Sequence, residues 1–209
     1  MAEIHHNKVP LLKGDEPFIY QNGNKAGFTI LDFWRFQFSN LLDMQGRVGE
    51  FIVAMALGKM DPDNNNGWTL WDIDYRETRI EVKTTAYFQP WRFERDENGN
   101  IINDDGKNYS EARTFSIRKA NGEENGEKKF KRWSDIYVFV LNTGKTEKDA
   151  DPRELKHWRF WVVKTKTINN LCKENKTISL KKLHDISKNK EGLSYDELKQ
   201  TIDKLIDNN

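Results

Sequence analysis

The chain has 209 residues, of which 36% are hydrophobic and 32% charged, and its formal net charge is +1 at pH 7. This length favours one domain with a full hydrophobic core, and the 12% of aromatic residues excludes a disordered chain. A single cysteine, Cys172, excludes an intramolecular disulfide and a multi-cysteine zinc site. The sequence has no signal-peptide core and no run of about 18 apolar residues, so we expect a soluble cytoplasmic protein that contacts no membrane.

The first part of the chain predicts two helices after a polar segment. We expect residues 1–209 to form one domain, with residues 1–27 as an N-terminal extension. Apolar residues at roughly helical spacing predict a helix over residues 30–42 with a broad buried stripe. A second helix is expected over residues 46–58, where the run FIVAMAL is apolar on every side and Gly58 supplies a stop signal. Such a helix packs against a sheet.

A change to a period of two residues predicts two strands in the next part of the chain. Over residues 71–75 and 80–84, apolar side chains alternate with polar ones. The link at residues 76–78 has the length of a hairpin turn, so we expect antiparallel neighbours whose polar side chains come within reach of one another. These side chains are Asp72 and Asp74 on the first strand, and Glu81 and Lys83 on the second.

The second half of the chain predicts further strands and a closing helix. Residues 113–118 read as a short strand between two glycine-containing loops, which are candidates for covering a ligand. Residues 134–142 match a fully buried strand and residues 157–164 a half-buried one, so at least five strands are expected in the sheet. The two loops cover residues 96–108 and 121–129.

The C-terminal segment, residues 190–209, predicts an amphipathic helix. Ser194 is a suitable N-cap, and Glu197 three residues later completes a capping box. We therefore predict an α/β fold with a mixed sheet of about five strands, flanked by the two early helices on one face and by later helices elsewhere.

The spacing Glu-x-Lys at Glu81 and Lys83 is a weak signal by itself. It begins at four other glutamates, which are Glu127, Glu154, Glu174 and Glu197. Only at Glu81 does it interrupt an apolar strand, and only there does a preceding strand carry acids. The context therefore singles out this hairpin.

Hydrolysis of a phosphodiester needs a hard divalent cation and a correctly placed water, and oxygen ligands suit Mg²⁺. Asp72 and Glu81 would supply carboxylates, and the backbone carbonyl of Val82 a third oxygen. The Lys83 ammonium would orient the attacking water or act as a base. Glu50 opens the apolar helix at residues 46–58, and a buried carboxylate needs a partner such as a metal ion or its water.

The chain order resembles that of the PD-(D/E)XK, or restriction-endonuclease-like, nuclease superfamily. In this order a helix that contains GE is followed by a strand that contains Asp and then by a strand that contains IEVK. The resemblance covers residues 46–91 and extends more weakly to the later strands. It implies a three-layer core and matches Asp72 to the first acid, Glu81 to the second and Lys83 to the lysine. Glu50 matches the helix glutamate.

The same resemblance matches Gln89 to a polar residue that follows the lysine strand, close to the metal or the DNA. No proline precedes Asp72, so Asp74 remains a rival for the first metal ligand. The resemblance implies a Mg²⁺-dependent deoxyribonuclease, in which Mn²⁺ substitutes for Mg²⁺, with DNA as partner. It also suggests a restriction or phage-defence enzyme.

Plainer interpretations stand beside these. The hairpin charges would form ordinary cross-strand pairs, and Glu50 would pair with Arg47. Residues 128–132 and the lysines of the last third are either solvated surface or a phosphate-binding groove, and Trp91 and Trp133 are candidates for stacking on bases.

The alternative function is a catalytically silent nucleic-acid-binding or protein-interaction subunit with the same fold. Because a double-strand cutter with one centre per chain usually needs two copies, a homodimer is expected of the enzyme.

Overall fold

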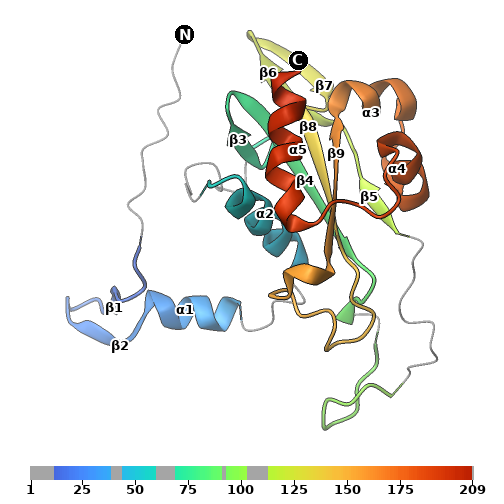
Figure 1. Cartoon of the computed structure of the whole chain (residues 1–209). Helices are drawn as coiled ribbons and strands as arrows, with labels where there is room; N and C mark the ends of the chain where they lie inside the picture. Colours follow the sequence, from blue (N-terminus) through green and yellow to red (C-terminus); the bar gives the residue numbers. More distant parts are fainter. Residues whose placement is uncertain (1–11, 39–43, 60–68, 91–92, 103–112, 209) are drawn as a thin grey trace.

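The computed structural model describes residues 12–38, 44–59, 69–90, 93–102 and 113–208, which form a mixed α/β structure (Figure 1). Within these ranges there are five α-helices and four sheets. The helices are α1 (Ile30–Gln37), α2 (Gln45–Ala56), α3 (Thr165–Cys172), α4 (Leu180–Ser187) and α5 (Tyr195–Asp207). A short 3-10 helix covers Leu155–His157.

The main sheet has four strands in the order β3-β4-β8-β9. Its strands are β3 (Ile73–Tyr75), β4 (Thr78–Ala86), β8 (Ile136–Asn142) and β9 (Trp158–Lys164). β3 runs antiparallel to β4, β4 parallel to β8, and β8 antiparallel to β9. All seven residues of β8 are buried, which confirms the fully buried strand expected from its sequence. The predicted hairpin is confirmed as well.

Three two-stranded sheets surround the main one. They are β1 (Pro17–Ile19) with β2 (Lys25–Thr29), β5 (Thr114–Ser116) with β10 (Thr177–Ser179), and β6 (Ala120–Glu124) with β7 (Glu127–Lys131). The strand expected over residues 113–118 is therefore present, but it pairs with β10 outside the main sheet. This is why the main sheet has four strands where at least five were expected.

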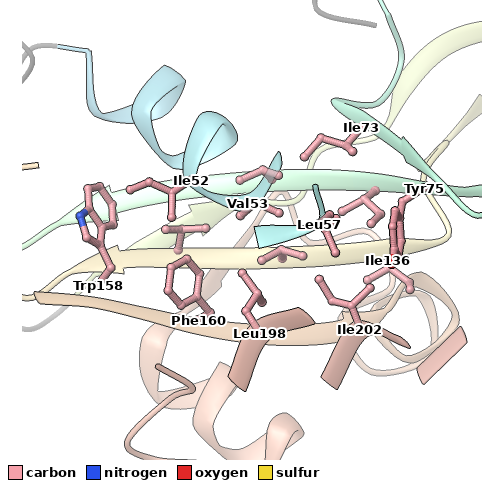
Figure 2. Packing of buried hydrophobic residues seen from close by; sticks show 14 residues of the cluster. Ile52, Val53, Leu57, Ile73, Tyr75, Ile136, Trp158, Phe160, Leu198 and Ile202 are labelled. Carbon is pink, nitrogen blue, oxygen red and sulfur yellow. The ribbon is translucent and has the colours of Figure 1, made fainter. Parts of the chain in front are cut away.

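One side of the main sheet packs against α2 and α5. Figure 2 shows Ile52 and Val53 of α2 and Leu198 of α5 against Trp158 and Phe160 of β9, all buried in one cluster. Alternate residues of β4 and β8 join this cluster, namely Ile80, Val82, Ile136, Val138 and Val140. The capping box of Ser194 and Glu197 is confirmed at the start of α5, whose apolar face closes this side of the core.

The other side of the main sheet packs against α3, α4 and the β5–β10 pair. Tyr137, Phe139 and Leu141 of β8 point to this side, where they form a second cluster. The elements outside the sheet contribute Phe115, Ile117, Ile168, Cys172, Ile178, Leu180 and Leu183. Because side chains alternate along β4, Glu81 and Lys83 belong to this same side.

The N-terminal helix differs from its prediction. α1 ends at Gln37 and has no buried residue, whereas a buried stripe over residues 30–42 was expected. Phe33 and Phe36 of α1 and the following Phe38 are exposed, and α1 lies with β1 and β2 beside the body in Figure 1. Helical spacing therefore predicted the helix correctly, but its packing against Gly14 and β2 leaves much of the apolar stripe exposed. Residues 39–43, where the prediction ended, lie outside the described residues.

The segment predicted as a loop over residues 121–129 is a β-hairpin. β6 and β7 pair in regular antiparallel register around Asn125 and Gly126. Both turn residues have positive φ angles, 55° and 79°, as a two-residue hairpin turn requires. The glycine and charge content of this segment suggested a loop, but Asn-Gly is a strong hairpin signal.

No helix in the described ranges is both long and apolar enough to cross a membrane.

A close contact between α2 and β4 sets the position of the predicted site. Gly49 of α2 faces Thr84 of β4 so tightly that an added Cβ would come within 2.0 Å of the Thr84 Oγ1. α2 ends near the predicted stop, where Gly58 has a φ of 69°. The expected packing of this helix against the sheet is confirmed, but Phe51 of its apolar run is 59% exposed. Only the face that carries Gly49, Ile52 and Val53 is buried.

We expect Gly49→Ala to lower the free energy of unfolding by about 2 kcal/mol, because the new methyl group forces α2 away from β4. Gly46→Ala is the matched control, since Gly46 lies on the same helix with open space around it. There the change should raise stability by about 0.5 kcal/mol. Chemical denaturation measures both. Equal effects of the two substitutions would contradict the tight contact.

Candidate active site

The hairpin opens at Asp72, the residue that precedes β3. The last regular pair of the hairpin is Ile73 with Ile80, and the preceding Asp72 still donates its N–H to the Ile80 carbonyl at 3.0 Å, which keeps it beside Glu81. The Val82 N–H has no strand carbonyl to bond here and donates instead to the Asp72 Oδ2, at 2.7 Å. Because N–H and C=O of one strand residue point the same way, the Val82 carbonyl also faces Asp72. This carboxylate therefore has a defined place beside Glu81.

Glu81 and Lys83 are two residues apart on β4, so their side chains lie on the same side of the sheet. Their side chains form an ion pair between Lys83 Nζ and Glu81 Oε1, and only 29% and 16% of the two side chains are exposed. The pairing expected from the plain interpretation is thus present. Its burial distinguishes it from Glu127 and Lys129 on β7, which have the same spacing but lie 3.8 Å apart with the glutamate 77% exposed.

Glu50 reaches the same region from α2. Burial raises the pKa of its carboxyl, and the negative charge of Asp72 raises it further, while Arg47 and Lys83 oppose the rise. Arg47 donates to the Glu50 Oε2 at 2.8 Å, so the expected salt bridge with Arg47 is confirmed. The charges of Asp72 and Lys83 act on Glu50 even so, which means that the helix carboxylate belongs to the same electrostatic cluster.

The Glu81 carboxyl is more enclosed than that of Glu50, with 16% against 23% of the side chain exposed. Burial raises its pKa, Lys83 lowers it, and the charges of Asp72 and Glu50 raise it again. The neighbouring Tyr137 of β8, in register with Glu81, is buried, and this burial together with the Glu81 charge raises the pKa of Tyr137 to about 12. No local pattern pointed to Tyr137, because its position beside Glu81 depends on the parallel register of β4 and β8.

The structure separates Asp74 and Gln89 from this cluster. Asp74 pairs in register with Arg79 and accepts a hydrogen bond from the Trp71 Nε1 at 2.8 Å. Gln89 follows the end of β4 and accepts a bond from Arg113 at 3.4 Å. Ala86 alone is about 16 Å along the strand from Glu81, at about 3.3 Å per residue. Asp72 is thus the acid beside Glu81, and Gln89 lies elsewhere.

The fit of a divalent cation can be judged from the donors. Three carboxylates, of Glu50, Asp72 and Glu81, face two cations, Lys83 and Arg47, and two of the three have raised pKa values. Hard oxygen donors with excess negative charge suit Mg²⁺ or Mn²⁺. In the described part of the chain, however, no three acidic, histidine or cysteine side chains form a ready-made metal cluster. The donor chemistry fits, and the ion pair with Lys83 engages one of the two carboxylate oxygens of Glu81, Oε1.

The expectation that Trp133 is available to stack on bases is wrong. It is 4% exposed, and its indole N–H donates to the Ala120 carbonyl at 2.9 Å, so it packs under the β6–β7 hairpin. Trp91 lies outside the described residues.

Comparison of the chain with protein-family models, curated proteins and solved structures gives no match.

We expect Asp72→Asn to raise the free energy of unfolding of the metal-free protein by about 1 kcal/mol at pH 7, and its melting temperature with it. The amide oxygen still accepts the Val82 N–H, while the charge that repels Glu81 and Glu50 is gone. Because the folded pKa values of both glutamates are raised, their repulsive ionisation develops as pH rises through those values. The gain should therefore vanish below about pH 4, where carboxyl groups are protonated.

Asp74→Asn is the matched control for this prediction. Its charge lies beside Arg79, whose pKa it helps to raise, so removing it should leave stability unchanged or lower it. Thermal melts in a chelator at pH 4 and pH 7 make the comparison. Equal stabilisation by both variants would remove Asp72 from the repulsive cluster.

Proposed function

We propose that this chain is a divalent-metal-dependent endonuclease that hydrolyses DNA phosphodiester bonds, with Mg²⁺ as its natural ion and Mn²⁺ as a substitute. The observation that carries the proposal is the opening of the hairpin at Asp72. There the Val82 N–H holds the Asp72 carboxylate beside Glu81, which is paired with Lys83 two residues further along β4. Glu50 supports it from α2, since its charge and that of Asp72 act on each other.

The fold belongs to the same proposal. Helices contribute to the clusters on both sides of the mixed sheet, as a three-layer restriction-endonuclease-like core requires. The chain order of Glu50, Asp72, Glu81 and Lys83 supports the PD-(D/E)XK assignment, and a restriction or phage-defence role is the biology it suggests.

In the mechanism we infer, Asp72, Glu81 and the Val82 carbonyl hold the ion, with Glu50 assisting through a water. When bound, the ion neutralises charge that develops on the phosphate and favours hydroxide over water. The Val82 N–H keeps the Asp72 carboxylate in place, so this ligand needs no reorganisation. The Lys83 ammonium, released from Glu81, donates hydrogen bonds that orient the attacking water.

A second candidate is a nucleic-acid-binding or protein-interaction subunit without turnover. The observation that favours it is the pairing of both cations, Lys83 with Glu81 and Arg47 with Glu50. Such pairs leave the carboxylates satisfied without an ion. Metal titration separates the candidates, because a silent module binds DNA equally well with and without the ion, and a protein-interaction subunit binds neither.

We expect the purified protein to cut DNA with Mg²⁺ or Mn²⁺, and Glu81→Gln and Lys83→Met each to reduce the rate by about 100-fold or more. The matched controls are Glu127→Gln and Lys129→Met, which alter the same spacing on the exposed β7 strand. Both controls should keep the wild-type rate. Single-turnover cleavage of supercoiled and linear DNA is the measurement.

No cleavage by the wild-type protein with either ion, or full activity in both site variants, would overturn the proposed enzyme. Thermal melts of each variant show whether lost activity reflects lost folding. An RNA substrate in parallel reactions tests the choice of DNA.

A further inference from the structure

A basic pocket lies between the β6–β7 hairpin and the end of α3, on the side of the main sheet that carries Glu81. Its volume is about 390 Å³, within the range of ligand pockets. It is lined by Lys119, Lys131, Arg132, Asn169, Lys173 and Glu174. Four cationic residues therefore share the lining with one carboxylate.

Arg132 is the unusual member of this lining. It is 6% exposed, and its guanidinium donates to four oxygens, which are those of Ile117 O, Asn169 Oδ1, Lys173 O and Asn175 O. In the described part of the chain no carboxylate lies within ion-pair distance of it. Buried charges normally have a counter-ion. The carbonyl dipoles hold Arg132 rigidly, and the nearby charge of Glu174 reaches it without forming an ion pair, so its positive charge is balanced only in part at the wall of the pocket.

The lysines add to this positive charge. Lys119 pairs with Glu174 at 2.5 Å, yet Glu174 is 78% exposed, so water screens this pair. Lys131 lies 4.5 Å from the centre of the Trp133 ring and 2.7 Å from Glu124. The wall thus keeps a net positive charge that favours an anion.

The pocket and the proposed reactive centre are close neighbours. Tyr137, in register with Glu81, responds to the charge of Arg132 as well as to those of Glu81 and Asp72. The β6–β7 hairpin also contacts the segment before Asp72, because a Cβ on Gly122 would meet the Leu70 side chain at 2.6 Å. In Figure 1, β6, β7 and α3 lie at the same end of the sheet. One extended ligand can reach both places.

We propose that this pocket binds a backbone phosphate of the nucleic acid, at a nucleotide flanking the one attacked at the Asp72–Glu81 centre. The identity of the ligand rests on the proposed function. The cationic side chains of the pocket bind the flanking phosphate, while the Asp72–Glu81 centre acts on the reacting phosphate. Among the described residues no aromatic side chain lines it, so it contacts the backbone without reading bases. Binding there is independent of sequence and sensitive to salt.

The test replaces Lys119, Lys131 and Lys173 together by Gln and leaves Arg132 in place, because its bonds hold the fold. The control replaces three exposed lysines away from the pocket, Lys148, Lys181 and Lys204, and changes the net charge equally. The probe is a 20-base-pair duplex with Ca²⁺ in place of Mg²⁺, measured by fluorescence anisotropy over a salt series.

We expect the pocket variant to raise Kd about 10-fold or more and to lower the slope of log Kd against log salt by about 1, the value for one lost phosphate contact. The control should change Kd less than about 3-fold and keep the wild-type cleavage rate at saturating DNA. Equal Kd for pocket variant and wild type overturns the pocket while leaving the enzyme intact. DNA binding that depends on the pocket, without any cleavage, overturns the enzyme and supports the pocket.

Residues 12–38, with β1, β2 and α1, form an N-terminal group. Nine large hydrophobic side chains of this group are exposed, which are Leu12, Phe18, Ile19, Tyr20, Phe28, Leu31, Phe33, Phe36 and Phe38. Ala26 is the one hydrophobic residue of this range that is buried. A helix as short as α1 is marginal in water without tertiary packing. The group therefore presents apolar surface that a partner can cover.

We propose that a second copy of this chain covers the N-terminal group, so that two groups pack in an isologous dimer. At roughly 200 Å² for a large side chain, half exposed, the nine side chains present about 900 Å² of apolar surface. A stable interface buries about 800 Å² per partner. The exposed area thus matches what one dimer contact needs.

Light scattering over a concentration series tests this dimer on the full chain. We expect a dimer at micromolar concentration, and Phe33→Asp with Phe38→Asp to raise the dimer Kd at least 10-fold. Leu171→Asp is the control, since Leu171 is 54% exposed on α3 and outside the group. A monomer at about 100 μM, or a dimer unchanged by the double variant, overturns the proposal, as does a dimer equally weakened by Leu171→Asp.

Discussion

The hydrogen bond from the Val82 N–H to the Asp72 carboxylate is the constraint on which the site depends. A backbone N–H buried in a sheet must have an acceptor, and β3 begins only at Ile73, too late in the chain to supply a carbonyl to Val82. The Asp72 side chain fills that role, so a requirement of the backbone places an acid opposite Glu81. Had β3 continued as a regular ladder, Asp72 would have no reason to turn toward this point.

The second constraint is the close approach of α2 to β4 at Gly49. Because glycine has no side chain, the helix backbone rests on Thr84, and the next residue, Glu50, comes within electrostatic reach of Asp72 and Lys83. The result is a cluster of carboxyl groups that repel one another inside a partly buried site. Sites of this kind lower stability, and proteins keep them where function requires the charge.

Several elements follow from local pattern and several do not. The strands at Glu81 and in β8, and the capped helix α5, were predictable because alternation, burial and capping residues all lie within a few positions of one another. The β6–β7 hairpin was missed although Asn125-Gly126 signals it, because charge and glycine content outweighed the turn. The burial of α1 was predicted wrongly, since amphipathic spacing cannot say whether a partner surface exists.

The sequence by itself determined that a charged hairpin with Glu81 and Lys83 interrupts an apolar strand, and that an acidic helix residue precedes it. Only the tertiary structure showed that Asp72, and not Asp74, lies beside Glu81, since their positions depend on where the ladder stops and on Arg79. Tertiary structure also separated Gln89 from the cluster and brought Tyr137 and the basic pocket beside it. Local pattern reflects the period of one element, whereas such neighbours arise from register and packing between elements distant in the chain.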